Sequence, residues 1–272
     1  MKTIREPAVA GMFYSSSPAQ LKDEIKLMLD ITKSEEKFSD PIGIVSPHAG
    51  YRYSGKTAAY AYNSISDKDF ETVIILSPSH REYFPGISIY SGDAYKTPLG
   101  IVELNKQMVS KLVENQSYIF EGKNGHKAEH AVEVQIPFLQ TIKKDFSIVP
   151  VVMGDQGKLF IDGLAEKLAE VVDDKTIIVA SSDLSHFYTS EVADKLDSII
   201  ERRIIAFDYE GLRDDLDARK CEACGGGPIV ALMKAAELIR KRKSMILART
   251  NSGEITGDKS EVVGYLSAVI YS

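Results

Sequence analysis

Short apolar runs alternate along the chain with longer segments of helical periodicity, and this alternation limits the fold more than any other feature. The apolar runs, rich in β-branched residues, predict strands at 42–45, 72–76, 87–90, 148–152, 176–180, 244–250 and 262–271. Helical spacing occurs at 18–29, 55–64, 105–115, 130–143, 158–172, 190–207 and 228–240. Most runs are apolar throughout, as strands covered on both faces are. The pattern predicts an α/β fold, a three-layer α/β/α sandwich around a mainly parallel, mixed sheet with antiparallel late strands.

The sequence predicts a single domain spanning residues 1–272. Its 272 residues, 44% of them hydrophobic, suffice for one large core, and neither a flexible linker nor an internal repeat divides them. The stretch 87–102 contains the turn signals Tyr90-Ser-Gly-Asp and Thr97-Pro-Leu-Gly. We therefore expect it to form a hairpin-like excursion from the sheet.

Charge and hydropathy exclude two classes of partner. The chain has 33 basic and 39 acidic residues, a net charge of −6, and its basic residues are scattered, which argues against a nucleic-acid surface. The sequence contains no run of eighteen apolar residues, and the N-terminal segment lacks the apolar core of a signal peptide. We expect a cytoplasmic protein that binds neither nucleic acid nor membrane.

Three of the five histidines follow predicted strands directly. His48 comes after the run 42–45, His80 after 72–76, and Asp183 with His186 after 176–180. In open α/β sheets, ligands bind beyond the carboxyl ends of the strands, where the connecting loops converge. A single loop histidine is most often an ordinary surface residue, but three at equivalent positions favour a joint site. Imidazole serves both as a metal ligand and as an acid or base, so both roles stay open.

The segment 126-HKAEHAVEVQIPFL-139 contains the pattern H-x-x-E-H of inverted zinc proteases. That motif needs both histidines on one helix face, yet the loop-forming residues 123–125 place His126 before the helix. We instead expect Glu129, His130 and Glu133 to form the first turn of a helix, where carboxylates favour the dipole.

The segment 221-CEACGGGPIVAL-232 places two cysteines before three glycines and an apolar helix. Pro228 suits a first helical turn, and a thiolate beside a helix N-terminus is a better nucleophile or metal ligand. A buried, inert cysteine is the competing interpretation. Thioredoxin-like chemistry is disfavoured because the glycines delay the helix that such a motif needs at once.

Taken together, these segments resemble the Memo family, whose bacterial and archaeal members are also called AmmeMemoRadiSam system protein B. The matching pieces, which extend along nearly the whole chain, are Arg5-Glu6-Pro, Ala10-Gly11-Met-Phe-Tyr14, Pro47-His48-Ala-Gly-Tyr51, Leu76-Ser-Pro-Ser-His80, Glu129-His130, Glu133, Pro137, Ser182-Asp183, His186, Cys224-Gly and Pro228. Each piece is weak alone, but their order and spacing are specific. The family is similar in fold to class III extradiol dioxygenases, which implies the α/β/α architecture predicted above.

The resemblance implies a metal site formed by His48, His80 and Cys224. It also places His130, Asp183 and His186 in the same pocket, with His186 similar to the acid/base histidine of the dioxygenases. Those enzymes have a carboxylate where this chain has Cys224. A thiolate is softer and favours Cu(I), Zn or Fe(II), so ring cleavage is not expected.

These implications lead to one main hypothesis, a non-haem iron or copper protein with O₂-linked oxidoreductase chemistry on a small substrate. Asp183, His186 and His130 are its candidate catalytic residues, and Tyr51, Arg52 and Glu133 its candidate substrate-binding residues. Two alternatives stay open. The pocket could hold a peptide or a partner protein without turnover, with a radical SAM protein as the partner that the family implies, or the ion could be zinc in a hydrolase.

Overall fold

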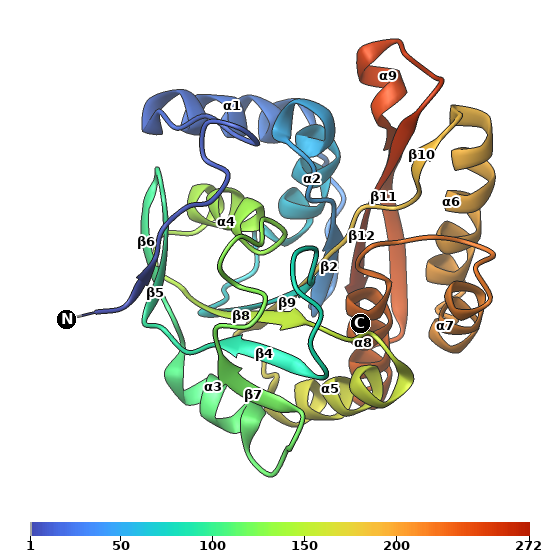
Figure 1. Ribbon diagram of the computed structural model, residues 1–272. Coiled ribbons are helices and arrows are strands. Elements are labelled where there is room, and N and C mark those ends of the chain that lie inside the picture. The colour runs from blue at the N-terminus through green and yellow to red at the C-terminus, as the bar shows by residue number, and fades with distance from the viewer. Residues whose placement is uncertain (1) are drawn as a thin grey trace.

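The computed structural model describes residues 2–272 and contains a nine-stranded central sheet (Figure 1). Its strand order is β10-β12-β2-β9-β3-β8-β4-β7, and β11 pairs with β12. The strands are β2 (Gly43–Ser46), β3 (Thr72–Pro78), β4 (Ile87–Tyr90), β7 (Ile119–Gly122), β8 (Ser147–Met153), β9 (Thr176–Ser181), β10 (His186–Tyr188), β11 (Lys243–Asn251) and β12 (Val262–Tyr271). The four central strands β2, β9, β3 and β8 are parallel, whereas β12 joins β2 and β4 joins β8 antiparallel.

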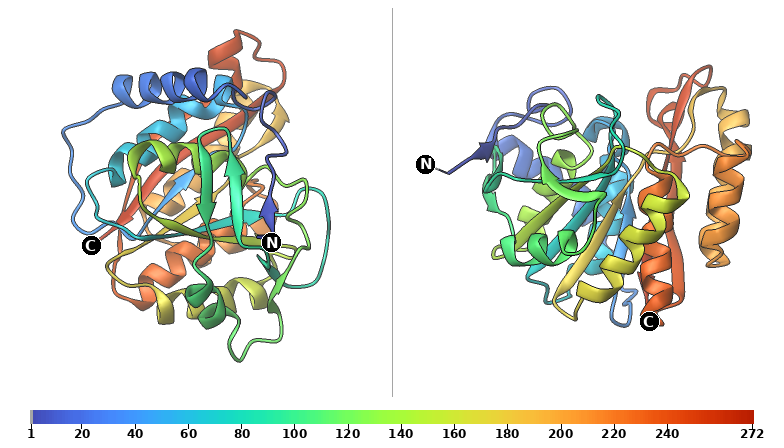
Figure 2. Two further views of the ribbon diagram at one scale, coloured as in Figure 1. Left: turned by 90° about the vertical axis from the view of Figure 1, so that its left-hand side faces the viewer. Right: turned by 60° about the horizontal axis from the view of Figure 1, so that its bottom comes forward.

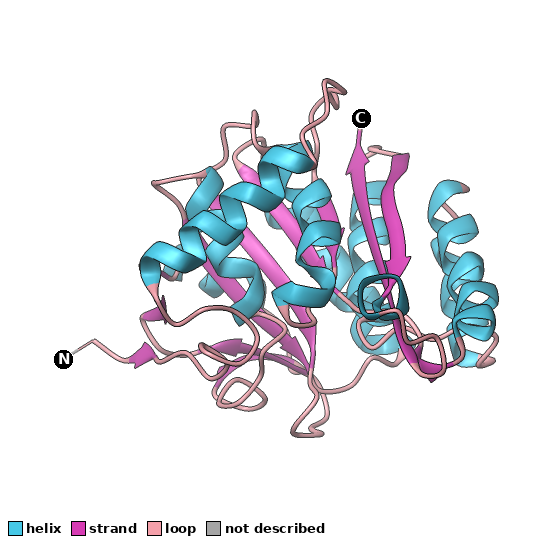
Figure 3. Cartoon of the chain, turned by 90° about the horizontal axis from the view of Figure 1, so that it is seen from above, coloured by secondary structure: helices cyan, strands magenta, loops and turns pink. Residues whose placement is uncertain are grey.

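Helices cover both faces of this sheet, which confirms the predicted α/β/α class. One layer contains α1 (Pro18–Ile31), α2 (Tyr51–Ile65), the 3-10 turn η1 (Glu133–Gln135) and α4 (Ile136–Ile142). The other contains α3 (Lys106–Val113), α5 (Lys158–Val171), α6 (Ser190–Ile205), α7 (Tyr209–Asp217) and α8 (Gly226–Leu238). Figure 2 shows α5 and α8 side by side, and in Figure 3 the helices of the first layer lie across the strands.

The two cores follow from the twofold alternation of side chains along each strand. In β3, Ile74 and Leu76 face the α5/α8 layer, while Val73 and Ile75 face the α1/α2 layer. Each residue of β3 is buried, as the continuous apolar run predicted. Within residues 2–272, no helix has the length and apolar content to cross a lipid bilayer.

Most predicted elements are confirmed to within a few residues, but two expectations are wrong. Residues 87–90 belong to the central sheet as β4, and the hairpin is formed instead by β5 (Ala94–Thr97) and β6 (Gly100–Glu103), which pair with β1 (Ile4–Arg5) in a small separate sheet. Residues 130–132 are not helical, because η1 begins at Glu133. The helices α7 and α9 (Ser252–Thr256) were not predicted.

A buried ion pair joins the N-terminal segment to the loop before η1. The guanidinium of Arg5 donates to the Glu133 carboxylate and to the Glu129 carbonyl oxygen. The same carboxylate accepts from Ala8 N at 2.7 Å, from Val9 N at 3.0 Å and from the Tyr14 hydroxyl. Glu133 therefore fixes the path of residues 5–14 across the first helix layer.

We predict that Glu133→Ala destabilises the fold by about 3–5 kcal/mol, because removal of one member of a buried pair leaves Arg5 uncompensated. Glu103→Ala, which removes an exposed pair with Lys2 at 2.8 Å, is the matched control and should cost less than about 1 kcal/mol. Urea unfolding of both variants measures the difference. Equal losses would contradict a dominant structural role for Glu133.

Candidate metal centre

The site lies where three parallel strands end side by side. Ser46 of β2 is in register with Ser181 of β9, and Leu76 of β3 with Ala180. The loops that leave these strands contain His48, His80 and Asp183, so the strand pairing brings these residues to one edge of the sheet. Cys224 reaches the same edge from the segment before α8. The ligand atoms of His48, His80 and Cys224 lie within 4.8 Å of one another.

Hydrogen bonds fix the tautomer of His48. The hydroxyl of Ser181 donates to the Ala131 carbonyl oxygen at 2.8 Å, so it can only accept from His48 Nδ1, which lies 2.9 Å away. Gln135 Nε2 also donates to the Ser181 hydroxyl oxygen, at 2.8 Å. His48 therefore has its proton on Nδ1, and the free lone pair of Nε2 points toward Cys224 Sγ at 3.1 Å. Burial, together with nearby His80, lowers the pKa of His48 to about 3, so the ring is neutral.

His80 is oriented by a buried carboxylate. Glu129 accepts from His80 Nδ1 at 2.9 Å and from its backbone N at 2.7 Å, which leaves Nε2 of His80 as the nitrogen with a free lone pair. Burial opposes ionisation of Glu129, but the hydrogen bonds from His80 and Ala131 prevail and hold its pKa at about 2. Such carboxylate–histidine pairs commonly orient metal ligands.

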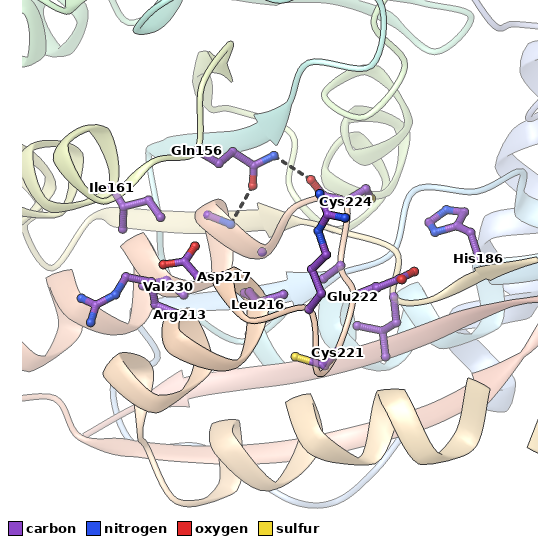
Figure 4. A pocket seen from close by; sticks show the side chains of 15 residues that line it. Gln156, Ile161, His186, Arg213, Leu216, Asp217, Cys221, Glu222, Cys224 and Val230 are labelled. Atoms are coloured by element: carbon purple, nitrogen blue, oxygen red, sulfur yellow. Dashed lines mark hydrogen bonds between the residues drawn. The ribbon is translucent and has the colours of Figure 1, made fainter. Parts of the chain in front are cut away.

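The segment that contains Cys224 is held from two sides. Gln156, in the loop after β8, donates to the Cys224 carbonyl oxygen at 2.8 Å and accepts from Gly227 N at 2.7 Å (Figure 4). On the other side Gly225 lies against β9 so closely that a Cβ would be 2.2 Å from the Ser181 carbonyl oxygen, so this approach requires glycine. The sequence pattern suggested the glycines but gave no sign of Gln156.

Cys224 is protonated in this arrangement. Burial, and then the nearby carboxylate of Asp183, raises the pKa of the thiol. The groups that would stabilise a thiolate are nevertheless in place, since Asp183 N donates to Sγ at 3.2 Å and α8 begins two residues later. A bound cation would supply the missing positive charge and displace the proton.

His130 lies beside the cluster rather than in it. Its ring centroid is 4.7 Å from that of His80, 5.3 Å from that of His48 and 4.8 Å from that of Phe13. Burial, followed by the effect of His48, lowers the pKa of His130 to about 4. His80, Glu129 and His130 form a second group of potential ligands within 4.8 Å. Because the Glu129 carboxylate already accepts from His80 Nδ1 and from the backbone N–H groups of His80, His130 and Ala131, it is better placed as an orienting residue.

Asp183 and His186 lie on the α8 side of the cluster. Asp183 is buried and its Oδ1 accepts from His48 N at 2.7 Å, so it positions the His48 loop. Burial raises the pKa of Asp183, against the opposing hydrogen bond from His48. His186, in β10, is half-buried and lines a cavity together with Cys224 (Figure 4). Cys221 is buried outside the cluster.

The structure gives the candidate substrate-binding residues other surroundings. The Tyr51 hydroxyl donates to the Val134 carbonyl oxygen at 2.6 Å, and its buried ring packs on Phe138. Tyr51 and Arg52 border a cavity between α1 and residues 11–15, away from Cys224. All four lone pairs of Glu133 are used by the donors described above, so no free acceptor is left for a substrate.

The protease pattern at 126–130 does not form a site. His126 Nδ1 is 2.8 Å from the Tyr95 hydroxyl and its Nε2 is 3.1 Å from the Ser88 carbonyl oxygen. These contacts lie in the β4/β5 region, and His126 is not in a helix with His130. His126 lies before the helical residues, as predicted, and it is a buried structural histidine.

These features define a class, an α/β/α protein whose strand-end loops bring together two imidazoles and a thiol that could hold a metal ion. The sequence profile described as Memo-like protein matches residues 5–269. A MEMO1 family protein of Thermoplasma volcanium is 39% identical over 267 residues, covering 98% of both chains, and one of Methanosarcina mazei is 36% identical over 271 residues, covering 98% of this chain and 99% of the other. The chain belongs to the Memo-like family.

A solved structure shares the fold at low sequence identity. It is an uncharacterized protein of Escherichia coli K12, with a TM-score of 0.51 and 12% identity, covering 84% of this chain and 98% of that one. This likeness confirms the architecture alone.

We predict that Gln156→Ala releases the Cys224 segment and accelerates alkylation of the Cys224 thiol by about ten-fold, since both hydrogen bonds between Gln156 and this segment are lost. Gln107→Ala, an exposed residue of α3, is the matched control. Mass spectrometry after a timed iodoacetamide reaction measures each cysteine separately, and Cys221 should stay slow. An unchanged rate at Cys224 would show that Gln156 does not restrain it.

Proposed function

We propose that this protein binds one redox-active transition-metal ion, iron or copper, through His48, His80 and Cys224, and uses it for O₂-linked oxidoreductase chemistry on a small substrate. One observation supports this most directly. Both imidazoles have Nδ1 bonded to a protein oxygen, which leaves Nε2 free beside the Cys224 sulfur. Ligating histidines characteristically use their second nitrogen in this way.

The donor set suits such an ion. Two neutral imidazoles and a thiolate are borderline to soft ligands, which favour iron, copper or zinc over magnesium or calcium. Three protein ligands leave further coordination positions open for exogenous molecules, the usual arrangement of reactive rather than purely structural sites. Zinc fits the same donors, so the identity of the ion separates this proposal from a hydrolase.

When bound, an iron or copper ion would supply one-electron redox chemistry and a binding position for O₂. The protein residues have separate tasks. Ser181 and Glu129 hold the two histidines in their binding tautomers, and Asp183 positions the His48 loop. Burial lowers the pKa of His130 to about 4, so near neutrality it would be an unprotonated but weak proton acceptor beside the cluster. His186 would exchange protons with a molecule in the cavity that it lines.

We predict that protein purified without oxygen contains about one iron or copper ion per chain, and that it consumes O₂ with an oxidisable substrate. Cys224→Ser should lose the metal, because oxygen is a poorer ligand for these ions. Cys221→Ser is the matched control and should retain it, since Cys221 is outside the cluster. Elemental analysis and an oxygen electrode give the two readouts.

The outcomes separate the alternatives. Zinc at one ion per chain without O₂ consumption would favour the hydrolase, and metal-free protein would favour a binding module. Equal metal content in Cys224→Ser and Cys221→Ser would contradict the proposed ligand set.

We also predict that Ser181→Ala weakens metal affinity by about 10–100-fold, the usual effect of removing an orienting partner of a ligating histidine. Ser88→Ala is the control, because Ser88 lies in β4 outside the cluster and its buried hydroxyl has no hydrogen-bond partner within residues 2–272. Competition with a metal chelator measures both affinities. An unchanged metal affinity in Ser181→Ala would show that metal binding does not depend on the hydrogen bond that fixes the His48 tautomer.

A further inference from the structure

A cavity of about 390 Å³ lies between the start of α2, α9 and β12. These three elements contact one another, and Figure 1 shows α9 above β12. The cavity borders the candidate metal centre through the backbone, because Ala49 follows His48 directly and Val263 pairs with His186. The other lining residues are Tyr53, Ser252, Thr256, Asp258, Glu261 and Tyr265.

The hydroxyl of Tyr265 is the polar group that distinguishes this cavity. Tyr265 is only 2% exposed, yet among residues 2–272 its hydroxyl forms no hydrogen bond of normal geometry. The Ser252 hydroxyl lies nearby, but its oxygen already accepts from a backbone N–H at 3.0 Å. The fully enclosed hydroxyls without a partner belong to other residues, Ser88, Ser185 and Ser267. The Tyr265 hydroxyl therefore reaches accessible space, and the cavity is the space that Tyr265 lines.

The other deeply buried tyrosines have protein partners. Tyr14, Tyr62 and Tyr95, each at most 4% exposed, bond their hydroxyls to Glu133, Gln135 and His126, respectively. This is the usual state of a buried tyrosine, whose ring is apolar but whose hydroxyl needs a partner. Tyr265 departs from this rule at a cavity wall, where a bound molecule could supply the missing partner.

The Tyr265 hydroxyl would act as a donor to such a molecule. Burial, and then the nearby carboxylate of Asp183, raises the pKa of Tyr265, so the group keeps its proton. A hydroxyl that keeps its proton can donate to a carbonyl or ether oxygen. The ligand should therefore have an acceptor oxygen.

The remaining lining favours an uncharged ligand. It includes the carboxylates of Asp258 and Glu261 but no basic side chain, so an anion would be repelled. Both carboxylates are exposed to water, and Asp258 already accepts from Ser260 N at 2.9 Å and from the Ser260 hydroxyl at 2.6 Å. Neither acid is thus a desolvated partner for a cation.

We propose that this cavity binds a small uncharged molecule with an apolar ring and an acceptor oxygen, such as an aryl ketone or an aryl amide. The Tyr265 hydroxyl donates to that oxygen, and the ring packs against Tyr53 and Val263. The binding itself needs no metal. Only the role of the bound molecule as a substrate rests on the proposed function.

The test is titration of the full chain with acetophenone, followed by ligand-observed NMR, in metal-free and in metal-loaded form. α-Methylstyrene, which has the shape of acetophenone but no oxygen, and benzoate, which adds a negative charge, are the companion ligands. Benzoate should bind about ten-fold more weakly than acetophenone, because its charge would be desolvated beside two carboxylates. Binding to metal-free protein separates this proposal from the proposed function, since it can succeed or fail without the ion.

Tyr265→Phe is the decisive variant, because it removes the hydroxyl and keeps the ring. It should weaken acetophenone binding about five-fold, the effect of one neutral hydrogen bond, and leave α-methylstyrene binding unchanged. Its melting temperature should stay the same or rise, because the lost hydroxyl had no protein partner, so misfolding cannot explain the loss of binding. Tyr83→Phe is the matched control, since it removes an exposed hydroxyl that donates to Asp155 at 3.0 Å, outside the cavity lining.

Four results would overturn the proposal. They are the absence of saturable acetophenone binding, an unchanged acetophenone affinity in Tyr265→Phe, and an equal loss of affinity for acetophenone and α-methylstyrene in that variant. The fourth is a lower melting temperature of Tyr265→Phe, which would show that the hydroxyl has a partner within the protein.

Discussion

The hydrogen-bonded register of the parallel strands β2, β9 and β3 is the constraint on which the site depends. It places Ser46 opposite Ser181 and Leu76 opposite Ala180, so that the loops after all three strands begin at one level. A one-residue slip of β9 would turn Ser181 to the other face of the sheet. His48 would then lose the acceptor that fixes its tautomer, and the Gly225 contact that positions Cys224 would be lost with it. The strand pairing that forms the sheet therefore also positions the candidate metal ligands.

The electrostatics of the site favour a cation. Burial keeps the His48 imidazole unprotonated and the Cys224 thiol protonated, so these two candidate ligands are neutral. Two carboxylates, Glu129 and Asp183, lie immediately behind them and accept mainly from N–H groups. A positive ion would be stabilised by these charges and by the thiolate that it creates. The proposed metal ion would therefore bind among groups that hydrogen bonds have already oriented.

The sequence predicted the strands well because strands buried on both faces appear as uninterrupted apolar runs. The sequence also predicted that His48, His80 and Asp183 lie at one edge of the sheet, because loops that follow parallel strands converge at the carboxyl ends of those strands. The sequence did not predict the role of Glu129, because a carboxylate in the first turn of a helix and a carboxylate in a loop cannot be told apart from the local sequence. Gln156 and Ser181 were missed because their partners are backbone groups and residues distant in the chain. The sequence did not predict α7, because this helix is short and acidic, and it gave no sign of the internal hydrogen-bond partners of Tyr51 and Glu133.

X-ray absorption spectroscopy of the metal-loaded protein tests the central claim most directly, because it identifies the atoms bound to the ion. The account predicts one sulfur neighbour at about 2.3 Å together with imidazole nitrogens at about 2.0–2.1 Å, the distances usual for such ligands. A spectrum with only nitrogen and oxygen neighbours would contradict the joint binding of one ion by His48, His80 and Cys224.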